Sequence, residues 1–299
     1  MAPWRFHDET RELDETVRRE APGAFIALPD GVTHYELAGP PDGRPVVLIH
    51  GFSTPYYLWD PTAVALAEAG FRVLRYDLYG RGYSDRPDLA NDAALFCRQL
   101  HALITALGLS LPVDVFGISM GGVIAVSFAD AYPDWVRKLV LVDPAGMITQ
   151  SSWMSWLVRL PYLGEWVMDH FGTKTIVDGL AKDLHNAAAV AAYQEKYLAQ
   201  MQIVGFRKSL LSTVRSGMVS SHRATYERVG QHPRPVLLIW GREDRMVPFE
   251  TSEQVVAAMP QAEFHAIDNA GHIPHYERPD VVNPLLLEFL SRAEKAQAQ

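Results

Sequence analysis

The sequence predicts an α/β fold in which helices cover both faces of a mostly parallel sheet, with an all-helical insertion late in the chain. Short apolar runs alternate with helix-length segments, which is the pattern of a parallel sheet. Several of the runs are continuously apolar, as strands buried on both faces require. The alternation then stops for one long stretch and resumes, which places that stretch outside the sheet.

The elements follow from this pattern in order. Strands are expected at residues 25–28, 32–38, 45–50, 71–77, 113–117, 136–143, 235–241 and 262–267. Helices are expected between them at residues 60–69, 92–107, 120–132, 251–259 and 281–291. From residue 145 to residue 230 only helical patterns occur, over a stretch too long for a loop. We therefore divide the chain into a charged N-terminal segment (1–23), a core (24–144 and 231–299) and an inserted helical cap, or lid (145–230).

Composition and charge exclude several classes of function. The net charge is −8 at pH 7 and no long basic run occurs, which argues against a nucleic-acid partner. No stretch reaches the length of a membrane span, and the N-terminus lacks the apolar region of a secretory signal, so we expect a cytoplasmic protein. The single cysteine, Cys97, precludes an internal disulfide and a cysteine-paired metal site. We expect no metal and no organic cofactor, and a monomer or a homodimer.

The segment GISMGG (117–122) lies where a predicted strand passes into a predicted helix. Ser119 has glycine two positions before it and two positions after it, which is the G-x-S-x-G nucleophile elbow. A sharp strand-to-helix turn strains the serine backbone, and side chains at the flanking positions would collide with neighbouring elements. The same turn puts the Met120 N–H at a helix N-terminus, where an anion is stabilised. Ser119 is therefore the candidate nucleophile.

An oxyanion hole is predicted beside this serine. The segment HGF (50–52) ends a predicted strand, and its loop can aim the Phe52 N–H at the same point as the Met120 N–H. Two such donors stabilise the charge that develops on an attacked carbonyl oxygen. His50 precedes the loop, and we expect it to order the loop through hydrogen bonds.

The loops after two later strands supply the other members of a catalytic triad. The segment GREDRMVP (241–248) puts Asp244 at the carboxyl end of one strand, and NAGHIPHYERP (269–279) does the same for His272. Serine, aspartate and histidine then occur in the order expected on this architecture. The sequence predicts a triad of Ser119, Asp244 and His272.

These segments together resemble the α/β-hydrolase superfamily with a helical cap. HGF, GISMGG, GREDRMVP and AGHIPHYERP match motifs of that family in the expected order, and the match runs from residue 24 to the C-terminus. The segment DLYGRGYSD (77–85) also resembles the family's D-x-x-G-x-G-x-S turn. The resemblance implies an eight-stranded, mostly parallel sheet whose second strand is antiparallel.

The resemblance also orders the alternatives for the triad. His272 stands where the family pattern places its histidine, whereas His275, three residues on, is expected in the pocket or on the surface. Asp143 occupies a position from which some members of the superfamily supply their carboxylate. It is kept as the alternative to Asp244, which matches the commoner arrangement.

The expected reaction follows from these roles. His272 takes the proton of Ser119 as the hydroxyl attacks an acyl carbonyl, and Asp244 orients the imidazole. The dehalogenases and epoxide hydrolases of the superfamily carry aspartate at the elbow, so serine excludes them. We expect a carboxylesterase that cleaves small to medium apolar esters through an acyl-enzyme.

Two alternatives stay open. The C–C bond hydrolases of aromatic ring-cleavage products resemble this chain in cap and overall length. They usually show a tryptophan after the catalytic histidine and a glycine-rich loop after HG, whereas here Ile273 follows His272 and HGFSTP replaces the loop. This departure disfavours C–C cleavage. Members with intact triads can also serve as ligand receptors, and turnover would distinguish a receptor from an enzyme.

The cap limits the substrate. Aromatic and methionine side chains concentrate between residues 153 and 171, and most of them are expected to be ordinary cap core. Some must face the cleft, because a cap over the elbow forms its roof. An apolar pocket with few charges favours small to medium uncharged acyl or aromatic esters. The residues expected to line the pocket are His50, Ser53, Trp153, Trp156 and Ile273.

Overall fold

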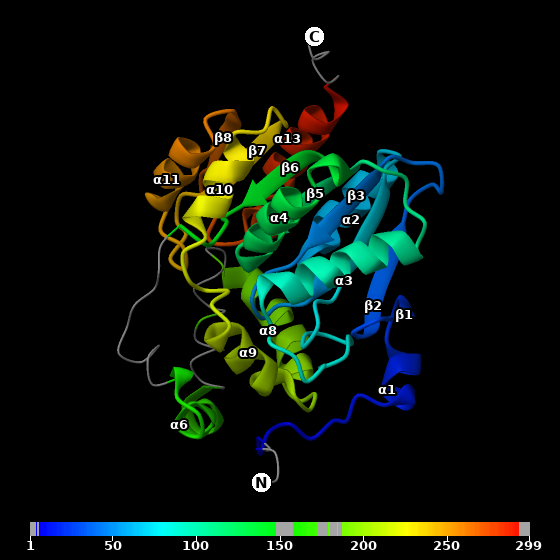
Figure 1. Cartoon of the computed structure of the whole chain (residues 1–299), viewed down its shortest axis with the longest axis vertical. Helices are drawn as coiled ribbons and strands as arrows, with labels where there is room; N and C mark the ends of the chain where they lie inside the picture. Colours follow the sequence, from blue (N-terminus) through cyan, green and yellow to red (C-terminus); the bar gives the residue numbers. More distant parts are fainter. Residues whose placement is uncertain are drawn as a thin grey trace.

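The computed structural model describes residues 4, 6–147, 158–172, 179, 184 and 187–292, with the backbone alone for residues 187–192. One eight-stranded sheet forms its centre (Figure 1). The strands are β1 (Ala24–Leu28), β2 (Gly31–Ala38), β3 (Pro45–Ile49), β4 (Arg72–Tyr76), β5 (Val113–Ile118), β6 (Val136–Val142), β7 (Val236–Gly241) and β8 (Ala262–Ile267).

The order of the strands in the sheet is β1-β2-β4-β3-β5-β6-β7-β8. Strand β2 pairs antiparallel with β1 and β4, and the remaining neighbours pair in parallel. All residues of β3, β5 and β7 are buried, which explains why their sequences are continuously apolar. The predicted fold class and its antiparallel second strand are confirmed.

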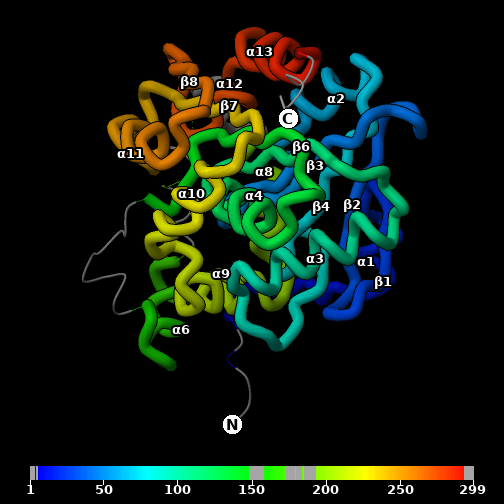
Figure 2. Tube along the Cα trace, turned by 45° about the horizontal axis from the view of Figure 1, so that its top comes forward, coloured from blue at the N-terminus to red at the C-terminus, as the bar shows by residue number. Residues whose placement is uncertain are grey.

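Helices cover both faces of this sheet (Figures 1 and 2). One face packs against α3 (Ala93–Ala106), α4 (Met120–Ala131), α10 (Arg223–Gly230) and α11 (Thr251–Ala258). The other face packs against α2 (Asp60–Glu68) and α13 (Pro279–Ser291), together with the short helices η1 (Tyr56–Trp59) and α12 (Pro274–Glu277). The 3₁₀ turn η2 (Pro133–Trp135) leads into β6. No helix in the described part of the chain combines the length and the apolar character needed to cross a membrane.

The elements described between β6 and β7 are helical. They are α6 (Leu163–Val167), the turn η3 (Met168–Gly172), α8 (Ala187–Met201), α9 (Phe206–Arg215) and α10. Figure 1 shows α6, α8 and α9 together at the end of the molecule opposite α13. Helix α10 packs instead on α4 and α11, so it covers the sheet although the sequence division places it in the insertion. We propose that α6, η3, α8 and α9 form the cap, and we use the name for these four elements.

The N-terminal segment, for which the sequence predicts no role, is bound to the cap. Glu9 is 3% exposed, and its carboxylate accepts hydrogen bonds from the N–H groups of Gly205 and Arg207, each at 2.7 Å. These two N–H groups belong to the start of α9, where a helix has no internal partners for them. Arg11 adds a parallel β-bridge to Ile203. Residues 9–11 therefore fasten the chain to the N-terminus of α9.

The following helix fastens the same segment to the core. Helix α1 (Glu15–Glu20) begins at Asp14, whose side chain accepts a hydrogen bond from the Val17 N–H at 2.9 Å. Arg18 of this helix forms an ion pair with Asp85, in the loop after β4. The N-terminal segment thus connects the cap to the sheet domain.

A buried pair joins β2 to the turn after β4. His34 and Asp77 are fully buried, with His34 Nδ1 at 2.8 Å from Asp77 Oδ2 and His34 Nε2 at 2.6 Å from the Pro22 carbonyl oxygen. Burial lowers the pKa of His34, but the charge and hydrogen bond of Asp77 and the Pro22 carbonyl outweigh it, so the pKa is raised above 6.5. Both ring nitrogens face acceptors, which suits the imidazolium form.

Replacing Glu9 by alanine should destabilise the cap. The change leaves two N–H groups of α9 without their partner, and we expect the free energy of unfolding to fall by about 2 kcal/mol. Urea unfolding measures it. Glu15→Ala is the matched control, since Glu15 forms an exposed ion pair with Arg19 whose loss should be close to neutral. A loss for Glu9→Ala no larger than for Glu15→Ala would contradict the role of Glu9.

The His34–Asp77 pair should stabilise the fold in a pH-dependent manner. Because the pKa of His34 is raised on folding, its contribution is complete below pH 6.5 and is lost as the pH rises through the raised pKa. The difference in free energy of unfolding between the wild type and His34→Gln should therefore shrink with increasing pH. Urea titrations at a series of pH values test this. A difference that grows with pH would refute it.

Candidate active site

Ser119 lies between the end of β5 and the start of α4 in a strained backbone conformation. Its φ is 53° and its ψ is −120°, a region that residues other than glycine rarely adopt. The Ser119 N–H donates to the Val142 carbonyl at 3.0 Å, and the Ser119 carbonyl accepts from the Ala145 N–H at 3.0 Å. The adjoining strand β6 and the loop after it therefore hold the strained residue in place.

The two glycines of the elbow are required by close packing. A Cβ atom at Gly117 would collide with the carbonyl of Gly121, and a Cβ atom at Gly121 would collide with the carbonyls of Ile49 and His50. The backbone of α4 thus approaches both its own strand β5 and the end of β3. This is the arrangement expected of a G-x-S-x-G elbow.

His272 and Asp244 lie side by side in the loops after β8 and β7. The distance between His272 Nδ1 and Asp244 Oδ2 is 2.8 Å. Asp244 Oδ1 accepts two further hydrogen bonds, from the N–H groups of Met246 at 2.7 Å and Val247 at 2.9 Å. These contacts fix the orientation of the Asp244 carboxylate beside the imidazole. With Nδ1 directed at Asp244, the His272 Nε2 is the atom suited to take the Ser119 proton.

Ser119 and His272 line one cavity of about 90 Å³. Helix α8 of the cap contributes Tyr193 to its wall, and Tyr193 is hydrogen-bonded to Thr54 at 2.8 Å. The other described residues of the wall are Gly51, Phe52, Ser53, Thr54, Leu58, Ile118, Met246 and Ile273. Apart from His272, the described residues that line the cavity carry no ionisable group other than the Tyr193 phenol. The site is therefore a small and largely neutral pocket.

The loop after β3 passes close to the nucleophile. A Cβ atom at Gly51 would lie 3.5 Å from Ser119 Cβ and 4.0 Å from Ser119 Oγ. Phe52 lines the same cavity, and Met120 begins the twelve-residue helix α4. Of the two residues predicted to form the oxyanion hole, Phe52 thus shares a cavity with Ser119 and Met120 follows it in the chain.

The structure brings together part of the predicted substrate pocket. Ser53 and Ile273 line the cavity, whereas Trp153 and Trp156 lie outside the described residues. His50, which was also expected in the pocket, is fully buried and is not among the described residues that line the cavity.

The two ring nitrogens of His50 connect the loop after β3 to the turn after β4. Nδ1 lies 2.9 Å from the Gly51 carbonyl oxygen, and Nε2 accepts from the Leu78 N–H at 2.9 Å. Burial lowers the pKa of His50 to about 4, so the ring is neutral. His50 therefore orders the oxyanion loop, as its position before that loop predicts.

The alternatives for the triad occupy different places. His275 is fully buried with its ring centroid 4.1 Å from that of Trp59, so its predicted place in the pocket or on the surface is wrong. Burial lowers the pKa of His275 to about 3. Asp143 is buried beside Asp244, and its Oδ1 accepts a hydrogen bond from the Gly241 N–H at 2.9 Å.

The three ionisable groups near the elbow, Asp143, Asp244 and His272, are close enough together to chelate a cation. However, the hydrogen bond between His272 Nδ1 and Asp244 Oδ2 already joins two of the atoms that would have to face the ion. The arrangement suits proton transfer better than metal binding.

Arg81 is a residue near the site that the sequence analysis missed. It is fully buried, and its Nε donates to the Phe52 carbonyl at 2.8 Å while its Nη2 donates to Thr213 Oγ1 of α9 at 2.8 Å. No carboxylate of the described residues forms an ion pair with it, and burial lowers its pKa to about 9. Arg81 thus connects the oxyanion loop to the cap. The only signal in the sequence was an arginine between the two glycines of DLYGRGYSD.

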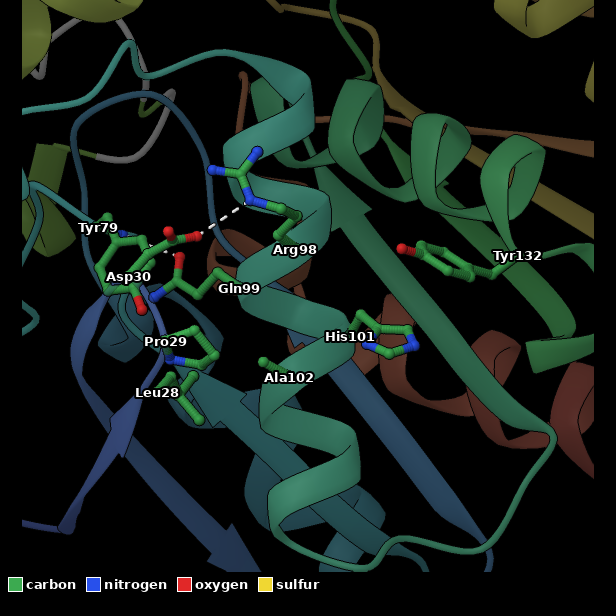
Figure 3. A pocket seen from close by; sticks show the side chains of 9 residues that line it. All are labelled: Leu28, Pro29, Asp30, Tyr79, Arg98, Gln99, His101, Ala102 and Tyr132. Atoms are coloured by element: carbon green, nitrogen blue, oxygen red, sulfur yellow. Dashed lines mark hydrogen bonds and ion pairs between the residues drawn. The ribbon is translucent and has the colours of Figure 1, made fainter.

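A second hollow lies away from the triad, between the turn after β1 and helix α3 (Figure 3). At about 470 Å³ it is larger than the cavity at Ser119. Its charged residues Asp30 and Arg98 pair with each other at 3.1 Å, and the Gln99 amide is hydrogen-bonded to the Tyr79 N–H and to Thr33. The hollow contains no nucleophile beside a base, so the smaller cavity is the candidate active site.

Comparison with known proteins agrees with this geometry. The family described as serine aminopeptidase, S33, matches residues 40–279. The chain belongs to this family. It is 29% identical to the 2-hydroxy-6-oxononadienedioate/2-hydroxy-6-oxononatrienedioate hydrolase 1 of Dechloromonas aromatica, over 93% of this chain and 98% of that protein.

Solved structures show the same fold. The meta-cleavage product hydrolase from Pseudomonas fluorescens superposes with a TM-score of 0.74 at 26% identity, over 91% of this chain and 98% of that one. A thermophilic esterase from Thermogutta terrifontis superposes with a TM-score of 0.76 at 24% identity, over 90% and 98% of the two chains. The chain is therefore a hydrolase with the α/β-hydrolase fold, as its motifs predict.

Removing the Arg81 guanidinium should slow the reaction of Ser119. Arg81→Met deprives the Phe52 carbonyl of its donor, and we expect a rate about tenfold lower because the oxyanion loop is no longer held. The rate of covalent labelling by a fluorophosphonate measures this without knowledge of the substrate. Arg98→Met, on the exposed side of α3, is the control. Equal labelling rates in the two variants would show that Arg81 does not support the loop.

Proposed function

We propose that this protein is a serine hydrolase that cleaves uncharged carboxylic esters through an acyl-enzyme. His272 Nε2 takes the proton as Ser119 Oγ attacks the ester carbonyl, and Asp244 stabilises the imidazolium that forms. The N–H groups of Phe52 and Met120 stabilise the tetrahedral oxyanion. His272 then gives its proton to the leaving alkoxide. A water molecule, deprotonated by His272, attacks the acyl-enzyme and releases the acid.

The neutral wall of the cavity is the observation that carries the choice of an ester. Most of the described residues that line it are apolar or hydrogen-bonding groups without charge. Such a wall accepts an uncharged acyl group, whereas a buried carboxylate needs a cation or several donors. The cavity is also small, at about 90 Å³. We therefore expect short acyl chains to react fastest.

A second candidate is hydrolysis of a C–C bond in a ring-cleavage product. The names of the relatives support this activity better than ester cleavage, since the relative from Dechloromonas aromatica is named for a dienedioate. Such a substrate carries two carboxylates. No lysine or arginine is among the described residues that line the cavity, and Arg81 already donates to Phe52, Tyr79 and Thr213. The site chemistry thus favours the ester, and the relatives favour the dienoate.

The family description does not by itself imply an aminopeptidase. A free amino terminus in the substrate would be bound by a carboxylate at the mouth of the site. None of the described residues lining the cavity is aspartate or glutamate. Peptide substrates are therefore the weakest of the three classes.

Hydrolysis of a p-nitrophenyl ester series, from acetate to palmitate, should peak at short chains. The same enzyme is assayed on a ring-cleavage dienoate, and Ser119→Ala is the control for both reactions. We expect this variant to lose all turnover while its melting temperature changes little, because alanine removes only the hydroxyl.

The outcomes separate the candidates. If kcat/KM is higher for the dienoate than for the esters, C–C bond hydrolysis would replace ester hydrolysis as the proposed function. Binding of either compound without turnover would support a ligand receptor. Turnover retained in Ser119→Ala would overturn the assignment of the nucleophile.

A further inference from the structure

The end of β6 carries a buried carboxyl group that the mechanism does not use. Asp143 has a φ of 41°, in the left-handed region that a residue other than glycine enters at a cost. It is fully buried, and its N–H donates to the Ile239 carbonyl of β7 at 2.9 Å. The hydrogen bond from the Gly241 N–H to Asp143 Oδ1 directs the side chain towards the carboxyl end of β7. The loop that bears Asp244 begins there.

Asp143 lies against the triad candidates. One carboxylate oxygen of Asp143, one of Asp244 and one ring nitrogen of His272 are all within 4.8 Å of one another. Two ionised carboxylates this close in a buried site repel each other strongly, so one of them keeps a proton. Asp244 is in hydrogen-bond contact with three groups, the N–H groups of Met246 and Val247 and the His272 ring, whereas Asp143 accepts from the Gly241 N–H. Asp143 is therefore the member of the pair that is neutral.

The second oxygen of Asp143 supports this assignment. Asp143 Oδ2 is buried and receives no hydrogen bond from a donor among the described residues. A buried carboxylate oxygen without a donor is costly, whereas a protonated one becomes a donor itself. The neighbouring Asp244 carboxylate, one oxygen of which lies within 4.8 Å of an oxygen of Asp143, is a suitable acceptor.

The charges around Asp143 act in the same direction. Burial raises the pKa of Asp143 well above its ordinary value, and the neighbouring charge of Asp244 raises it further, as does Glu277 of α12. The hydrogen bond from Gly241 opposes these effects. His272, in the loop after β8, also faces the pair.

We propose that Asp143 is a positioning residue of the triad, which donates a hydrogen bond from its Oδ2–H to the Asp244 carboxylate and so holds Asp244 towards His272. The role rests on the proposed function of Ser119, Asp244 and His272. It has a second consequence, because a donor on Asp244 withdraws negative charge from the partner of His272. Asp143 thereby limits the basicity of the imidazole.

Two variants distinguish the effect of the hydrogen-bond donor of Asp143 from the effect of its side-chain volume. Asp143→Asn keeps an oxygen for Gly241 and offers an amide N–H to Asp244. Asp143→Leu has a similar volume and offers neither group. We expect kcat to fall about ten- to hundredfold in Asp143→Leu with little change in KM, and Asp143→Asn to restore it.

The pH profile distinguishes positioning from a general loss of structure. Without the donor, Asp244 stabilises the His272 imidazolium more strongly, so the acidic limb of kcat/KM should move to higher pH in Asp143→Leu. In Asp143→Asn the acidic limb of kcat/KM should lie at the same pH as in the wild type. A variant that is merely less well folded would lose rate at every pH and leave the limb in place.

The rate of labelling by a fluorophosphonate, measured over the same pH range, is a second readout, and Ser119→Ala is the control for it. Failure of the wild type to label, or labelling of Ser119→Ala, would refute the proposed function and not the role of Asp143. Wild-type labelling rates and an unmoved acidic limb in Asp143→Leu would overturn the positioning role. Asp143→Asn as slow as Asp143→Leu would also overturn it, since a carboxylate would then be required at this position.

An infrared measurement tests the proposal if Asp143→Leu does not fold. The carbonyl band of a protonated carboxyl group should be present in the wild type at neutral pH and absent in Asp143→Asn. Persistence of that band in Asp143→Asn, or its absence from the wild type, would overturn the assignment of the proton.

Discussion

The strained backbone of Ser119 is the constraint on which the rest of the site depends. A residue other than glycine in such a conformation costs about 1–3 kcal/mol, so its surroundings must hold it. Hydrogen bonds to Val142 and Ala145 and the tight packing of Gly117 and Gly121 do so. Because β3, β5, β6, β7 and β8 are parallel, their carboxyl ends meet at this edge. The loops that carry the other predicted site residues then converge without long connections.

Buried charge is distributed around this edge at the junctions between elements. Arg81 joins the oxyanion loop to α9, the His34–Asp77 pair joins β2 to the turn after β4, and Glu9 joins the N-terminal segment to α9. Each of these groups is satisfied in part by backbone N–H or carbonyl groups. In a low dielectric such contacts are strong, and an unpaired group is costly. Loss of any one of these groups would therefore leave a buried polar partner unsatisfied at a junction.

The sequence predicts the sheet and the triad because both are encoded locally. Burial on both faces leaves continuous apolar runs, and the elbow at Ser119 demands glycine at fixed spacing. Asp244 and His272 follow strands directly, so topology alone brings their loops together, and the structure shows their hydrogen bond.

Other features depend on contacts between distant segments and leave no local pattern. The burial of His275 depends on Trp59, which no spacing reveals. The role of Arg81 requires the position of Thr213 on α9, and that of Glu9 requires the start of the same helix. The substrate is the feature that the sequence predicts least well. One α/β-hydrolase fold accommodates several reactions through changes in a few residues that line the active site.

The contact between the N-terminal segment and α9 has a consequence for the evolution and engineering of this protein. Glu9 and Arg11 supply groups that the start of α9 and the loop before it lack, although nearly two hundred residues separate them in the chain. If a cap were grafted from a relative without its own N-terminal segment, the N–H groups at the start of its α9 would lack partners. The smallest part that can be exchanged between family members is therefore discontinuous in sequence. Recombination should keep the N-terminal segment and the cap together.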